Sequence, residues 1–150
     1  MHVKATITGK PLASALGITA REWTNLGNLL RDRVVLRTRR QHVDADLVPF
    51  HAYSEGYKRT KGKKGGLLGG GSVDLTGAGG GPKMLNDIVV RSASATTNPR
   101  LVLGFATSGK DQIARYHMGE GRVDRLFFAL SDADVDYATT YIRGRLKGSA

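Results

Sequence analysis

The chain has 150 residues, a length that suits one domain with a sizeable core, so we expect a single domain over residues 1–150. It contains no cysteine, which excludes disulfides, thiolate catalysis and Cys-ligated metals, and no apolar run approaches the roughly 18 residues of a membrane span. The 23 Lys and Arg outnumber the 13 Asp and Glu, and the net charge of +10 points to an anionic partner: nucleic acid, an acidic protein surface or an anionic membrane.

An alternating segment opens the chain. Val3, Ala5 and Ile7 alternate with polar residues, which predicts a half-buried strand that stops at the turn-forming residues 9–11. The segment lacks the apolar core of a signal peptide, so we expect the protein to fold in a cytoplasm.

The first helix has the strongest local signals. Thr19 and Glu22 have the spacing of a capping box, and Ile18 and Trp23 stand where a hydrophobic staple would place them. An apolar stripe follows at helical spacing, made of Trp23, Leu26, Leu30 and Val34. Arginines that complement the helix dipole close the helix, namely Arg37, Arg39 and Arg40. We therefore predict a helix over about residues 20–40, with its stripe in the core; the alternative is that the stripe forms an interface.

A basic, glycine-rich insertion at about 57–83 separates the two halves of the chain. Glycine loses the most backbone entropy on ordering and has nothing to pack, so we expect this insertion to be either disordered or ordered by a partner. Its lysines allow two interpretations: a solvated loop that maintains solubility, or a flexible arm that lies along a polyanion through sequence-independent phosphate contacts.

Two apolar segments in the second half predict strands. Residues 88–90 are β-branched, and residues 101–106 place their alternate apolar side chains on one face. With turn-forming residues at 96–99 between them, we expect an antiparallel hairpin. Residues 126–130 are apolar and short enough for a buried strand or for a segment that lines the core wall.

Two more helices are predicted. Residues 110–117 are predicted to form a short helix with Ser108 as its N-cap. The segment from Gly119 to Gly121 is predicted to end this helix. The last helix begins at a second capping box, Ser131 to Asp134, and ends at Gly148. Its predicted apolar stripe is Val135, Ala138, Ile142 and Leu146.

Together these segments predict an α+β fold. A long N-terminal helix and a C-terminal helix pack on a small antiparallel sheet, and a long Gly/Lys-rich loop or hairpin projects from it. We expect the large aromatic residues to form the core: Trp23, Phe105, Phe127 and Phe128.

The sequence has no pattern of a catalytic or cofactor site. The glycine clusters have neither the Walker spacing nor the dinucleotide spacing. The histidines are not paired with other ligands at metal spacing, and Asp132, Asp134 and Asp136 lack the rest of a calcium loop. We therefore expect no enzyme activity, no cofactor and no metal.

Several segments, taken in order, carry a resemblance to a known family. The segment Pro49–Arg59 is similar to F-x-P-Y-S-x-x-Y-x-x-R/K, and the segments Val73–Thr76 and Met84–Ile88 are similar to the two halves of V-D-L-T-x-(S/T)-G-x-M-L-x-x-I. Residues 101–105 resemble a strand, residues 114–119 resemble A-x-x-H-x-x-G, and residues 125–132 resemble R-x-F-(F/L)-G-L-S-D. The family is the phage virion morphogenesis (tail completion, Mu G-like) family. This chain departs from it by an insertion at 77–83 and by Ala129 in place of a glycine.

The resemblance implies a structural protein of the neck of a tailed bacteriophage. Such proteins form a ring, often of six copies, around the DNA channel, complete the tail and join it to the head. The implied partners are neighbouring subunits, a head-closure or portal-side adaptor, a tail terminator and genomic DNA without sequence specificity. The implied location is the virion neck and tail, with host cytoplasm during assembly and no membrane.

The resemblance places the expected contacts in the insertion. The basic residues that would face the DNA channel or a partner are Lys58, Arg59, Lys61, Lys63, Lys64 and Lys83. The apolar residues that would contact neighbouring subunits are Leu67, Leu68, Val73 and Leu75. We expect residues 58–83 to be disordered in the free monomer and ordered in the ring. The alternative function is that of a small basic nucleic-acid-binding protein without sequence specificity, which acts alone.

Overall fold

A computed structural model of the protein describes residues 4–8, 18–52, 55, 59, 84–94, 100–120 and 126–147. The elements in chain order are β1 (Lys4–Thr8), α2 (Ala20–Leu36), the π-helical turn η1 (Arg37–Gln41), the 3-10 turn η2 (Met84–Asp87), β2 (Ile88–Ser94), β3 (Arg100–Phe105), α4 (Ser108–Arg115), the turn η3 (Tyr116–Glu120) and α5 (Asp132–Lys147). The predicted α+β class is confirmed.

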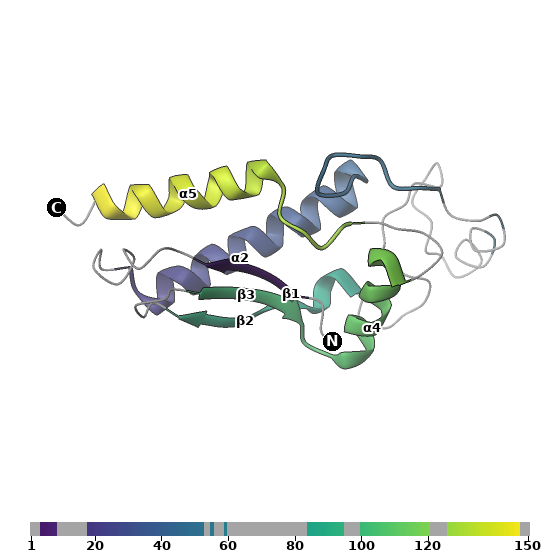
Figure 1. Ribbon diagram of the computed structural model, residues 1–150, viewed down its shortest axis with the longest axis horizontal. Helices are drawn as coiled ribbons and strands as arrows, with labels where there is room; N and C mark the ends of the chain where they lie inside the picture. Colours follow the sequence, from purple (N-terminus) through teal and green to yellow (C-terminus); the bar gives the residue numbers. More distant parts are fainter. Residues whose placement is uncertain are drawn as a thin grey trace.

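Helix α2 lies between the sheet and helix α5 (Figure 1). One side of α2 packs on the sheet, and α5 runs along its other side, whereas α4 lies at the end of the sheet beside η2. The predicted helices at both ends of the chain are therefore present. Helix α5 lies beside α2, and its Tyr137, Tyr141 and Ile142 pack against the common core.

The sheet has three antiparallel strands in the order β1-β3-β2. The predicted hairpin is confirmed, because β2 pairs with β3 from Ile88 opposite Phe105 to Ser94 opposite Arg100, with a register shift between Val90 and Ser92. Strand β1 pairs with the other edge of β3, and this places the most apolar strand in the centre of the sheet. The turn predicted at 96–99 lies outside the described residues.

Local signals explain where α2 begins. The Thr19 hydroxyl accepts from the Glu22 N–H at 3.2 Å, and the Glu22 carboxylate accepts from the Thr19 N–H at 2.8 Å, so the predicted capping box is confirmed. Gly27 lies against the sheet so closely that a Cβ there would be 2.7 Å from Leu101 Cδ1 and 2.7 Å from Val90 Cγ2. Only glycine lets the helix approach the strands at this distance.

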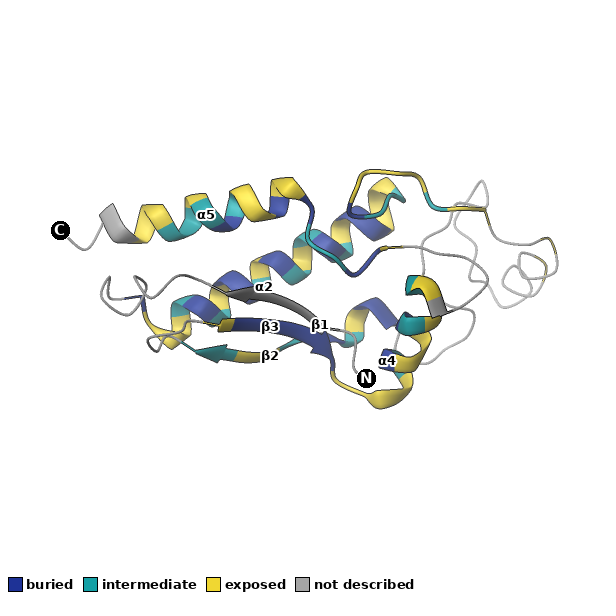
Figure 2. Ribbon diagram, viewed as in Figure 1, coloured by how far each residue is buried: buried dark blue, intermediate teal, exposed yellow. Residues whose placement is uncertain are grey.

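The core is apolar and continuous between α2, the sheet and the segment that precedes α5 (Figure 2). The predicted apolar stripe of α2 is buried, and so are the four aromatic residues expected in the core, Trp23, Phe105, Phe127 and Phe128. The ring centroids of Phe105 and Phe128 are 5.0 Å apart, at an aromatic contact distance.

Of the two alternatives predicted for residues 126–130, the structure has the segment that lines the core wall, through Phe127 and Phe128. Two details differ from the sequence predictions. The N-cap of α4 is Thr107, because Ser108 is already helical. Val135 is 49% exposed and does not belong to a buried stripe, because α5 touches α2 along a narrow line that contains Asp134 and Ala138.

Candidate assembly surface

Arg59 is the one predicted site residue that the described part of the chain contains, and it is exposed. The other predicted basic residues and the predicted subunit-contact residues lie outside the described residues: Lys58, Lys61, Lys63, Lys64, Lys83, Leu67, Leu68, Val73 and Leu75.

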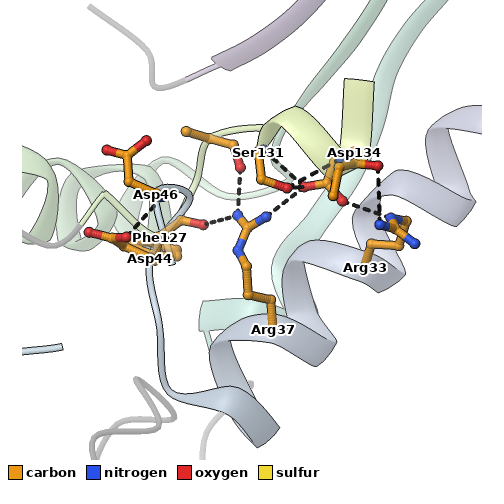
Figure 3. Close-up of polar contacts among 9 residues, drawn as sticks. Arg33, Arg37, Asp44, Asp46, Phe127, Ser131 and Asp134 are labelled. Atoms are coloured by element: carbon orange, nitrogen blue, oxygen red, sulfur yellow. Dashed lines mark hydrogen bonds and ion pairs between the residues drawn. The ribbon is translucent and has the colours of Figure 1, made fainter. Parts of the chain in front are cut away.

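Two arginines of α2 and η1 attach the start of α5 (Figure 3). Arg33 Nε donates to Asp134 Oδ1 at 2.7 Å, and Arg37 Nη1 donates to Asp134 Oδ2 at 2.5 Å. Arg37 Nη2 also donates to the Ala129 carbonyl oxygen at 2.6 Å. Arg37 thus joins η1 both to the first turn of α5 and to the segment that carries the core aromatics.

The second capping box completes this cluster. Ser131 Oγ accepts from the Asp134 N–H at 3.2 Å, and Asp134 Oδ2 accepts from the Ser131 N–H at 3.0 Å. The predicted capping box is therefore confirmed. A second role of Asp134 was not predicted from the sequence: the same carboxylate also binds Arg33 of α2 and Arg37 of η1, about a hundred residues earlier in the chain.

Asp134 remains ionised although it is buried. Burial is the largest single influence on its pKa and would raise it, but the Ser131 N–H, the Arg33 guanidinium, the Ser131 hydroxyl and the Arg37 charge together lower the pKa below the ordinary aspartate value. A buried carboxylate that accepts from Arg33, Arg37 and Ser131 is a structural clamp. The cluster accordingly holds α5 in place.

A tight turn follows η1 and presents two aliphatic residues to solvent. The Asp44 carboxylate accepts from the Asp46 N–H and from the Val48 N–H, both at 2.9 Å, and the Asp44 N–H donates to the Val48 carbonyl oxygen at 2.9 Å. The turn leaves Leu47 63% exposed and Val48 55% exposed. Leu47 has a φ of 63°, in the left-handed region that a leucine rarely adopts.

Two hollows share Leu36, and one of them reaches this turn. One, of about 220 Å³, is lined by residues of α2, η1 and the start of α5 together with Leu47. The other, of about 460 Å³, lies along α2 and η1 and is lined by Asp32, Val35, Leu36, Arg39 and Arg40. Leu36 itself is 47% exposed.

These residues form one surface with an apolar centre and a cationic rim. We call it the basic-apolar surface: Leu36, Leu47, Val48, Arg39 and Arg40. Exposed aliphatic side chains that gather beside a hollow, with arginines next to them, are typical of a protein-binding surface. A sequence signal for part of it exists, because Leu36 lies outside the apolar stripe that runs from Trp23 to Val34.

Within the described residues, no group of His, Asp and Glu side chains is arranged to hold a metal ion. No helix among them is both long enough and apolar enough to span a membrane.

Comparisons with known proteins found no matching family model, no matching curated protein and no matching solved structure.

Proposed function

We propose that this protein is a structural component of the neck of a tailed bacteriophage. In this proposal it forms a ring, of six copies, around the DNA channel, completes the tail and joins it to the head. Its partners are copies of itself, the head-side adaptor or portal complex, the tail terminator and the genomic DNA that passes through without sequence-specific contacts.

The observation that carries the proposal is the ordered set of segments that resemble the tail completion family. In the described parts of those segments, the residues that match the family's motifs have structural roles. Met84, Leu85 and Ile88, which match M-L-x-x-I, are all buried. Ala114 is buried in the core. Motifs whose residues build a core support a shared fold, and the assembly role is what the resemblance implies for that fold.

The later motifs support the same conclusion. The His117 ring meets the Phe127 ring edge to face, with centroids 6.4 Å apart. Phe127 and Phe128 are buried, and Ser131 caps α5. The histidine of the A-x-x-H motif therefore packs against an aromatic residue of the next motif, a contact that stabilises the fold.

The test is the mass of the protein in solution. We expect light scattering to show a concentration-dependent change from monomer to ring, and electron microscopy to show the ring on the ends of tail tubes. Weak binding to free duplex DNA would accompany this. A protein that is monomeric at every concentration and salt, and that does not bind tail tubes or portal complexes, would contradict the proposal.

The net charge of +10 favours a second candidate, a basic nucleic-acid-binding protein that acts alone. Such a protein would bind duplex or single-stranded DNA as a monomer. Its affinity would fall steeply as the logarithm of the salt concentration rises, because binding releases counterions from the phosphates. The same light-scattering series with duplex DNA added distinguishes the two functions.

A further inference from the structure

The outer side of α5 begins with an acidic ridge. Asp132, Val135 and Asp136 are all exposed, and we call these residues the acidic ridge. Asp134 and Ala138, which are buried, mark the side of α5 that faces α2. At about 100° per residue, Asp132 and Asp136 lie on the opposite side of the helix from those two residues. The ridge therefore points away from α2.

The charges of the ridge and of the basic-apolar surface are not neutralised by ion pairs between described residues. Ion pairs in this part of the molecule join Arg31 to Asp32 and join Arg33 and Arg37 to Asp134. Neither the guanidinium groups of Arg39 and Arg40 nor the carboxylates of Asp132 and Asp136 take part in them. The acidic ridge thus combines the aliphatic Val135 with two carboxylates. The basic-apolar surface combines exposed aliphatic groups with two arginines, and beside them lie Asp32, which pairs with Arg31, and the exposed Asp46.

Within one chain, the hollow lined by Leu36 and Leu47 reaches the start of α5, but Asp132 and Asp136 lie on the far side of that helix. The clamp of Arg33, Arg37 and Asp134 holds α5 against α2, with the ridge on the far side of α5. The basic-apolar surface lies on α2, η1 and the turn that follows. Complementary surfaces that face different directions on one chain join copies head to tail, and this arrangement closes into a ring when the rotation allows it.

We propose that the basic-apolar surface of one subunit binds the acidic ridge of the neighbouring subunit. Arg39 and Arg40 face Asp132 and Asp136 of the second copy, and the exposed Leu36, Leu47 and Val48 cover its Val135. The contact is the subunit interface of the ring in the proposed function, on which this inference rests. Because its outer charges are exposed to solvent, salt weakens the contact.

The test uses two charge-reversed variants, Arg39→Glu/Arg40→Glu and Asp132→Lys/Asp136→Lys. Each variant places like charges on both sides of the contact, so each alone is expected to need at least roughly 100-fold more protein for half-assembly than the wild type. Mixing them in equal amounts restores opposite charges at every contact and is expected to restore the wild-type mass. The mixed ring alternates the two variants, which closes only with an even number of copies such as six.

The matched control is Arg91→Glu/Arg100→Glu, which makes the same change in charge at exposed positions of β2 and β3. It is expected to assemble as the wild type does. Circular dichroism and the midpoint of urea unfolding show that every variant is folded.

The outcomes are distinct. Loss of assembly in each variant with recovery in the mixture supports the contact. A variant that assembles like the wild type, or a mixture of folded variants that stays monomeric while the wild type forms rings, overturns this contact and leaves the ring itself intact. A wild-type protein that never assembles overturns the proposed function, and the contact with it.

Discussion

Arg37 Nη1 donates to Asp134 Oδ2 at 2.5 Å, and both side chains are buried. The first residue follows directly after α2 and the second lies in the first turn of α5, 97 residues later. This ion pair is the most buried polar connection described between the N-terminal and C-terminal helices. It explains how α5 keeps its direction although only a narrow side of it is buried.

Replacing Asp134 with Asn is expected to destabilise the protein by about 3–5 kcal/mol, because it leaves the buried Arg37 guanidinium without a counter-charge. The measurement is the free energy of unfolding from urea denaturation. The control is Asp136→Asn on the same helix, which is exposed and is expected to change the stability by no more than about 0.5 kcal/mol. If the two substitutions changed the free energy of unfolding equally, the clamp would contribute little to the stability of the protein.

The contribution of Asp134 depends on pH. Its pKa is lower in the folded protein than in the unfolded chain, so its stabilisation is fully present above the unfolded pKa, about 4, and is lost as the pH falls through the folded pKa. The difference in unfolding free energy between the wild type and Asp134→Asn is therefore expected to stay constant from about pH 7 to pH 5 and to shrink below about pH 4. A difference that grows as the pH falls would contradict this sign.

Two glycines on helices should respond oppositely to alanine. At Gly27 the new Cβ would meet Val90 and Leu101 at 2.7 Å, and overpacking of this kind costs about 1–3 kcal/mol. At Gly144, on α5, a Cβ would meet nothing within 4 Å, so Gly144→Ala is expected to stabilise the protein by about 0.5–1 kcal/mol. Thermal unfolding of the two variants measures both effects. If Gly27→Ala stabilised the protein, α2 would be able to move away from the sheet without a loss of stability.

Leu47 offers a test of strain at the basic-apolar surface. Glycine is comfortable at the φ of 63° that Leu47 adopts, so Leu47→Gly is expected to stabilise the monomer by about 1 kcal/mol. The same substitution removes an exposed aliphatic group from the proposed subunit contact and is expected to weaken assembly. Urea unfolding of the monomer and light scattering of the assembly report the two effects separately. If Leu47→Gly assembled as the wild type does, Leu47 would not be part of the proposed subunit contact.

The N-cap of α2 has its own test. Thr19→Ala removes the acceptor for the Glu22 N–H and is expected to destabilise the protein by about 1 kcal/mol. Thr24→Ala serves as the control, since the Thr24 hydroxyl donates to the Ala20 carbonyl oxygen within the helix and caps nothing. Thr19→Ala should lower the free energy of unfolding more than Thr24→Ala does, by most of the roughly 1 kcal/mol that the cap contributes.

The amino-acid sequence by itself determined the elements whose signals lie within a few residues of one another. The capping boxes at Thr19 and Ser131, the apolar stripe of α2 and the two strands of the hairpin were predicted correctly. A cap or a stripe depends on neighbours at most four positions away, so the residues that define it can be read directly from the chain.

Only the tertiary structure decided the contacts between distant segments. It paired β1 with the free edge of β3, and it made Asp134 the shared partner of Arg33 and Arg37. It also exposed Val135 and Leu36, two apolar residues that helical periodicity alone does not assign to a partner. A side chain's burial and charge partners depend on which elements the fold brings beside it, and that information is not contained in the spacing of residues along one helix.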